Sequence, residues 1–191
     1  FAYDSSGTVT LEAVAWSSAT ARATALTTQN GVYVKNGATD RRYLGTVRMQ
    51  ATGQCEDSVT RRFVWNYYNR VHRELLVTES ANSWSYTTAS WTTFNSSTAN
   101  RVEFVIGVSE EPVYLLLLYV TSGGTGYGGI CLDNTNANDA RLKSWSTGSA
   151  FAVSVYHQLV AIGYHYLQLT QYGGSGVSFY GDNGTPTLVQ T

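Results

Sequence analysis

Apolar and polar residues alternate along this chain from end to end, and glycines interrupt the alternation at short intervals. Successive side chains of a β-strand point to opposite faces, so this pattern predicts strands rather than helices. Asn30-Gly31 and Asn36-Gly37 are hairpin-turn signals, and residues 19–25 read as a short helical or irregular crossing. The expected strands cover residues 9–16, 32–34, 42–50, 61–71, 74–79, 84–87, 101–108, 113–121, 129–132, 150–156, 161–171 and 177–180.

Two of these ranges carry unusual faces. In residues 61–71, the odd positions from Phe63 are aromatic or aliphatic except Asn69, so we expect this face to enter the core. The even positions from Arg62 to Arg70 combine arginine, asparagine and tyrosine with one valine, and we expect them to meet another sheet edge, a loop or a subunit. Residues 113–121 are nearly all apolar, which predicts a strand buried on both faces.

The composition agrees with an all-β protein. Only 13% of the 191 residues are charged, whereas the chain has 14 Tyr, 5 Trp and 18 Gly but 2 Pro. The length favours a single domain over residues 1–191 that buries a core of its own. We therefore predict a jelly-roll-like antiparallel β-sandwich. An immunoglobulin-type sandwich fits less well, because neither the Cys…Trp…Cys arrangement nor the usual size of about 100 residues matches this chain.

Charge and hydropathy exclude several classes of partner. A formal net charge of −1 argues against binding to nucleic acid or to an acidic membrane surface. No run approaches the ~18 apolar residues of a membrane helix, so no membrane insertion is expected. The chain starts at Phe1 without a signal peptide or an initiating Met, and we treat it as the ordered part of a longer polypeptide. Cys55 and Cys131 are interpreted as small buried hydrophobic residues in preference to a disulfide.

Three segments together carry a resemblance to a known group of proteins. They are residues 40–46 (DRRYLGT), residues 62–71 (RFVWNYYNRV), and residues 163–169 (GYHYLQL) with the later turn FYGDNG at 179–184. The chain resembles, over most of its length, a virion-protein domain of tailed bacteriophages and prophages, of the tail-fibre or head-decoration type. This resemblance implies a virion setting and a β-rich, trimeric module, and it implies no catalytic site.

Arginine, tyrosine and asparagine side chains on the first two segments form the candidate scaffold. They are either an inter-subunit seam or an intramolecular network that holds strand register, and the sequence leaves both open. We expect Arg61, Arg62 and Arg70 to pair with nearby acids or carbonyls, the acids being Glu56, Asp57, Glu74 and Glu103. The candidate scaffold residues are Arg42, Tyr43, Arg62, Asn66, Tyr68 and Arg70.

Aromatic residues beside Ser, Thr, Asn and Gly are candidates for binding a sugar ring. An exposed ring stacks on a sugar while neighbouring amides bond its hydroxyl groups, although the same rings are also suited to capping the ends of the core. The candidate glycan-binding residues are Trp84, Trp91, Tyr127 (at the centre of the glycine loop 122–129) and Trp145.

Metal binding and catalysis have little support. Residues 133–139 are rich in Asp and Asn, but they lack the glycine and glutamate of a calcium loop, so we expect a solvated turn. The three histidines lack zinc spacings and are expected to pack in strands. No nucleophile elbow, P-loop or dinucleotide fingerprint is present. Glu103, Glu110, Glu111 and Asp182 are the acids that a glycan-cleaving site would recruit, and no cofactor is expected.

These observations favour a non-enzymatic structural protein of a phage virion. We expect a surface fibre, spike or capsid-decoration module that forms a homotrimer and contacts other virion proteins. The alternative is a receptor-binding module that recognises a host-surface glycan, and a carbohydrate-active enzyme domain is a weaker alternative.

Overall fold

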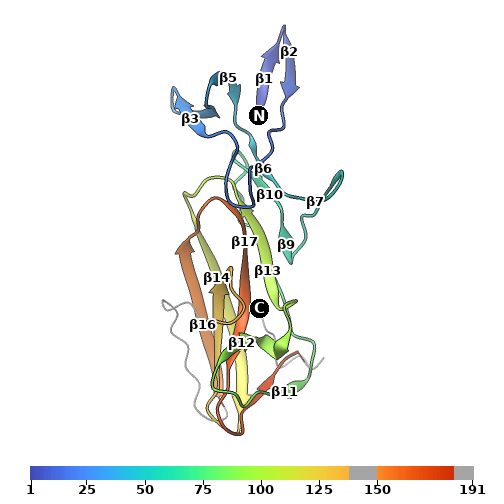
Figure 1. Ribbon diagram of the computed structural model, residues 1–191, viewed down its shortest axis with the longest axis vertical. Coiled ribbons are helices and arrows are strands. Elements are labelled where there is room, and N and C mark those ends of the chain that lie inside the picture. Colours follow the sequence, from blue (N-terminus) through green and yellow to red (C-terminus); the bar gives the residue numbers. More distant parts are fainter. Residues whose placement is uncertain (138–149, 183–191) are drawn as a thin grey trace.

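The structure, a computed structural model, describes residues 1–137 and 150–182 and consists almost wholly of β-strands (Figure 1). The predicted all-β antiparallel sandwich is confirmed. The described residues include one helical element, the 3₁₀ turn η1 (Phe94–Ser96). None of their helices is long and apolar enough to cross a membrane. The molecule is elongated, with an N-terminal sheet at one end and the sandwich at the other (Figure 1).

The N-terminal sheet has the strand order β2-β1-β5-β4-β3. Its strands are β1 (Ala2–Ser5), β2 (Thr8–Leu11), β3 (Leu26–Gln29), β4 (Val32–Lys35) and β5 (Ala38–Arg42). The predicted Asn30-Gly31 turn is confirmed: both residues have positive φ, 51° and 78°, as a tight two-residue hairpin requires. Residues 19–25 form an irregular segment and no helix, which is one of the two predicted alternatives. The strand expected over 9–16 ends at Leu11.

Short paired strands connect this sheet to the sandwich. β6 (Gly45–Val47) pairs with β10 (Val64–Asn66), and β7 (Met49–Ala51) forms a hairpin with β8 (Gln54–Cys55). The prediction of one strand over 42–50 was therefore wrong, because the chain changes partner between β5, β6 and β7.

The strand predicted over 61–71 is also broken. β9 (Arg61–Arg62) is followed by β10, which ends at Asn66. The Asn66 side-chain oxygen accepts hydrogen bonds from the backbone N–H groups of Tyr68 and Asn69, at 2.9 and 3.2 Å. Such a local bond turns the chain out of the extended conformation. Burial nevertheless alternates as expected, because Phe63 is buried while Val64 is exposed.

Two sheets make the sandwich. The β14 sheet has the order β11-β18-β14-β16, with β11 (Ser83–Ser85), β18 (Ser178–Tyr180), β14 (Pro112–Ser122) and β16 (Ala150–Leu159). In the β17 sheet, β17 (Gly163–Tyr172) pairs on one side with β12 (Trp91–Thr93) and β13 (Arg101–Ile106), and on the other with β15 (Tyr127–Leu132). β9 adds to β13 as a parallel strand.

The core fills the space between these sheets. Leu117 and Tyr119 of β14 meet Phe104 of β13 and Leu167 and Leu169 of β17, and each of these residues is at most 4% exposed. Burial of such large apolar side chains is the main source of stability in a two-layer fold.

Residues 74–79, a predicted strand, belong to no strand. The Glu74 carbonyl accepts hydrogen bonds from the Arg62 guanidinium at 3.0 and 3.1 Å, and the Leu76 N–H donates to the Val59 carbonyl at 2.7 Å. Leu75 and Val77 still pack against the core. The apolar alternation was therefore real, but the backbone groups of this segment bond to a side chain and a loop instead of a neighbouring strand.

Candidate functional site

Tyr43 is the centre of the contact between the N-terminal sheet and the sandwich. Its side chain is 2% exposed, and its ring lies 5.7 to 6.2 Å from the rings of Phe1, Trp65 and Tyr67. A methyl group on Gly107, just after β13, would lie 2.5 Å from the Tyr43 hydroxyl and 2.2 Å from Trp65. Glycine at 107 thus lets the sandwich approach this aromatic cluster closely.

Arg70 clamps the same contact from outside. Its guanidinium lies 5.0 Å from the ring centre of Trp65 and 4.6 Å from that of Tyr67. It also contacts Glu110 at 2.6 Å and Glu111 at 3.3 Å, in the loop between β13 and β14. The hydrogen bond from Arg70 is the main reason that the pKa of Glu110 lies below its ordinary value. A glycosidase acid needs the opposite shift.

The other candidate scaffold residues also find partners within the chain. Arg42 donates to the Tyr68 hydroxyl at 2.6 Å and lies over its ring, while Asn66 makes the turn described above. Arg62 contacts Asp57 and the Glu74 carbonyl, two of the groups that we expected for these arginines. The contacts are those that the intramolecular alternative requires.

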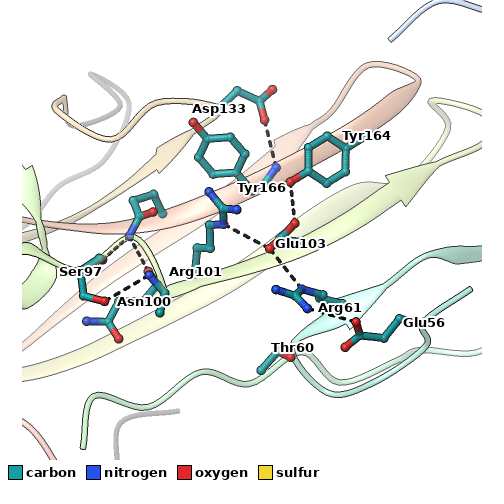
Figure 2. A network of polar contacts seen from close by, with 12 residues as sticks. Glu56, Thr60, Arg61, Ser97, Asn100, Arg101, Glu103, Asp133, Tyr164 and Tyr166 are labelled. Atoms are coloured by element: carbon teal, nitrogen blue, oxygen red, sulfur yellow. Dashed lines mark hydrogen bonds and ion pairs between the residues drawn. The ribbon is translucent and has the colours of Figure 1, made fainter. Parts of the chain in front are cut away.

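A polar network covers the outer face of the β17 sheet (Figure 2). Glu103, 7% exposed, contacts Arg61 at 3.3 Å and Arg101 at 3.2 Å, and it accepts a hydrogen bond from the Tyr164 hydroxyl at 2.5 Å. Arg61 also contacts Glu56 at 3.1 Å, so two of the four acids that we expected to pair with these arginines are partners of Arg61.

The arginines and Tyr164 of this network stabilise the ionised form of Glu103. Burial alone raises the pKa of Glu103, but Tyr164 and the two arginines outweigh it and leave the pKa below its ordinary value. Burial and the bond to Glu103 raise the pKa of Tyr164 to about 12. The network therefore fastens β9 to β13 with an ionised carboxylate at its centre.

The candidate glycan residues separate into two groups. Trp84 is occupied by the core: it stacks on Phe179 at 5.8 Å and donates its indole N–H to Gln171 at 2.6 Å. Trp91 and Tyr127 come together, because both lie opposite Tyr172 in the β17 sheet.

The Tyr172 ring lies 5.5 Å from Trp91 and 5.8 Å from Tyr127, so the three rings form an aromatic row across β12, β17 and β15. We had expected Tyr127 at the centre of a loop, but it is the first residue of β15. Tyr172 was not among the candidate glycan residues, because only the pairing register of β12, β17 and β15 places it between Trp91 and Tyr127. Trp145 lies outside the described residues.

Cysteine and histidine side chains depart from several expectations. Cys131 is buried as predicted, but Cys55 is exposed, because it ends the short outer hairpin strand β8; the two cysteines do not form a disulfide with each other. His165 is buried in β17 and contacts Asp133 at 2.7 Å, whereas His72 lies outside any strand and, like His157, is exposed. Within residues 1–137 and 150–182, no group of three or more His, Cys, Asp or Glu could hold a metal ion.

The outer face of β14 and β16 is largely apolar, and no layer of the described residues covers it. The prediction that residues 113–121 are buried on both faces was wrong: inward residues such as Leu117 are buried, but outward residues are not. A two-layer sandwich covers only one face of each sheet. Tyr114 is 57% exposed, and on β16 Val153, Val155 and Leu159 are 40%, 41% and 58% exposed.

A second group of exposed apolar residues lies toward the N-terminal sheet. Val9 and Leu11 of β2 are 80% and 73% exposed, and the paired residues Val47 and Val64 are 56% and 45% exposed. A cavity of ≈ 400 Å³ lies among Leu11, Val47 and Val64.

A second cavity, of ≈ 710 Å³, touches members of both groups, and its wall also includes the charged residues Arg62, Arg70, Arg73, Glu74 and Glu111. It shares Val64, Trp65 and Asn66 with the first cavity and reaches Tyr114 and Leu116 of β14. We call the whole set the apolar belt: Val9, Leu11, Val47, Val64, Tyr114, Val153, Val155 and Leu159.

Comparison of the chain with protein-family models, with curated proteins and with solved structures finds no match.

Proposed function

We propose that this chain is a non-enzymatic structural module of a bacteriophage virion, displayed on the particle surface as a fibre, spike or capsid decoration. It assembles as a homotrimer and contacts other virion proteins. The apolar belt is the observation that carries the proposal, because it supplies a surface for association with further copies of the chain.

The belt differs from an ordinary monomer surface. An antiparallel sheet whose outer face meets water normally places polar residues there, and soluble monomers rarely expose contiguous apolar patches. On β14 and β16 most outward positions are instead Leu, Val and Tyr, as in Leu116 opposite Val155 and Leu118 opposite Val153, although His157 lies opposite Tyr114. Permanent subunit interfaces are apolar in this way.

The junction between the two parts of the molecule supports the same proposal. Tyr43, Arg70 and Gly107 fasten the N-terminal sheet to the sandwich. An elongated unit (Figure 1) is suited to packing lengthwise against its copies.

Light scattering on the purified chain tests the assembly. We expect a trimer mass at micromolar concentration, and a monomer for the double variant Val155→Asp/Leu159→Asp. The matched control is Thr28→Asp, on an exposed position of β3. A monomeric wild-type chain, or a double variant that assembles as well as Thr28→Asp, would overturn the proposal. Electron microscopy of antibody-labelled particles that contain the chain tests the position on the virion.

The aromatic row favours a second candidate function, recognition of a host-surface glycan. Trp91, Tyr172 and Tyr127 are each half-buried, which leaves part of each ring accessible. Glycan-array binding that is lost in Tyr172→Ala and Trp91→Ala, at unchanged thermal stability, would support it. Equal binding by these variants and wild type would refute it.

A further inference from the structure

The edge of β14 that faces away from β16 is paired along only part of its length. β18 pairs with residues 120–122. Residues 112–118 face no strand on that side within the described part of the chain. The outer edge of β13, in the opposite sheet, is also only partly paired, because β9 pairs with it only at Glu103 and Phe104. In the described residues, the sandwich is therefore one strand short along this edge.

The ≈ 710 Å³ cavity lies at this edge. It is lined by residues 113–116 of β14 and by residues 104–106 of β13. Consecutive strand residues point to opposite faces, so a cavity that touches four in a row lies against the edge of the strand rather than against one face. Ile106, Val113 and Leu115, which pack on the core, form part of its wall.

The neighbouring segment of the chain does not complete the edge. Residues 71–75 line the cavity, but the backbone hydrogen bonds of Glu74 and Leu76 run to Arg62 and Val59, as described above. Within the described residues, the edge of β14 over 112–118 thus remains a template for another strand.

β2 has the features of a strand that fits this edge. It is an outer strand of the N-terminal sheet, and Val9 and Leu11 alternate with Thr8 and Thr10. Val9 and Leu11 point to one face and are the most exposed large apolar residues of the described chain, at 80% and 73%. Figure 1 shows the β1–β2 hairpin projecting from the end of the molecule.

We propose that the open edge of β14 is a strand-acceptor site, and that its occupant is β2 of a second copy of this chain. Backbone hydrogen bonds between the strands supply affinity, and pockets for alternate side chains supply specificity. Val9 and Leu11 enter the gap between the sheets over Val113 and Leu115, while Thr8 and Thr10 face outward beside Tyr114.

This inference deepens the proposed self-assembly and rests on it. Donor and acceptor lie on different parts of the chain, so the contact is heterologous. A heterologous contact closes when each copy donates to the next around a ring, and the proposed trimer is the ring of three copies.

Mixed disulfides between two single-cysteine variants test the inference. Both variants are made in a Cys55→Ser background; Thr8→Cys marks the donor and Tyr114→Cys the acceptor. We expect oxidation of the mixture to join the two chains at a yield about tenfold above that of Thr28→Cys with Tyr114→Cys. Thr28 is the matched control, because it is also an exposed threonine on an outer strand of the same sheet. Val9→Asp/Leu11→Asp in the donor should abolish the product.

Several outcomes would overturn the inference. One is equal yields from the Thr8 and Thr28 variants, and another is no product from either. A third is a disulfide within one chain that carries Leu76→Cys and Tyr114→Cys, since the chain's own segment would then occupy the edge. If the wild type is trimeric in light scattering while the Thr8 product is absent, the proposed function stands and the strand-acceptor site falls. A monomeric wild type overturns the proposed function itself.

Discussion

Removal of the Arg70 side chain is the most direct perturbation of the junction between the N-terminal sheet and the sandwich. The Arg70 side chain is 23% exposed and combines two acidic partners with two aromatic rings. Each partly exposed cation–π contact contributes ~0.5–1 kcal/mol. The ion pairs add little, because Glu110 and Glu111 are 36% and 67% exposed and water screens them; together they contribute about 0.5 kcal/mol.

The free energy of unfolding of Arg70→Ala should therefore fall by about 2 kcal/mol, which for a chain of this size lowers the melting temperature by roughly 4–8 °C. Urea denaturation followed by tryptophan fluorescence measures this as a lower midpoint at unchanged slope. Arg70→Lys keeps the charge but loses the planar stacking, so it should retain only part of the stability. High salt should reduce the loss only slightly, because the ring contacts depend little on ionic screening.

Arg73→Ala is the matched control for this prediction. Arg73 is 49% exposed and has one acidic partner, Asp57 at 3.2 Å. Its removal should change the free energy of unfolding by less than about 0.5 kcal/mol. Equal losses for Arg70→Ala and Arg73→Ala would show that Arg70 is not a clamp, and the stability argument for the junction would fail.

Three further predictions concern other parts of the molecule. Gly107→Ala should destabilise the fold by about 1–3 kcal/mol in urea denaturation, because its methyl group would overlap Trp65; wild-type stability would contradict the close approach. Burial lowers the pKa of His165, but the contact with Asp133 outweighs burial and leaves the pKa above 6.5. Protonated His165 therefore stabilises the fold fully below pH 6.5, and this stabilisation is lost as the pH rises through the folded-state pKa. Melting temperatures should accordingly fall over that range, and His165→Gln should flatten the profile; an unchanged profile in this variant would refute the assignment. Cys55, exposed and with a pKa raised by partial burial, should react with a thiol reagent in the native state, faster at pH 9 than at pH 7, as mass spectrometry would show; a native thiol that reacts only after denaturation would contradict this.

The candidate site was only partly foreseeable from residue types. The expectation that the arginines pair with acids was correct for Arg61, which contacts Glu56 just before its own strand and Glu103 on the neighbouring strand β13. The part played by Glu110 and Glu111 was not foreseen, because the turn after β13 that brings them to Arg70 is a feature of the tertiary structure. Trp84 and Trp91 looked alike in sequence, yet one packs in the core and the other lies in the aromatic row.

Local pattern by itself determined the fold class of this protein and most of its longer strands. Period-two alternation, continuous apolar runs and Asn-Gly turns are properties of neighbouring residues, so β4, β14 and β17 could be recognised without knowing their partners. Pairing and layering are not local. The sequence therefore did not show that residues 74–79 form no strand, or that no second layer of the described residues covers the outer face of β14. Only the tertiary structure decided these points, because a strand forms where a neighbouring strand accepts its hydrogen bonds, and an apolar face is buried only where another layer covers it.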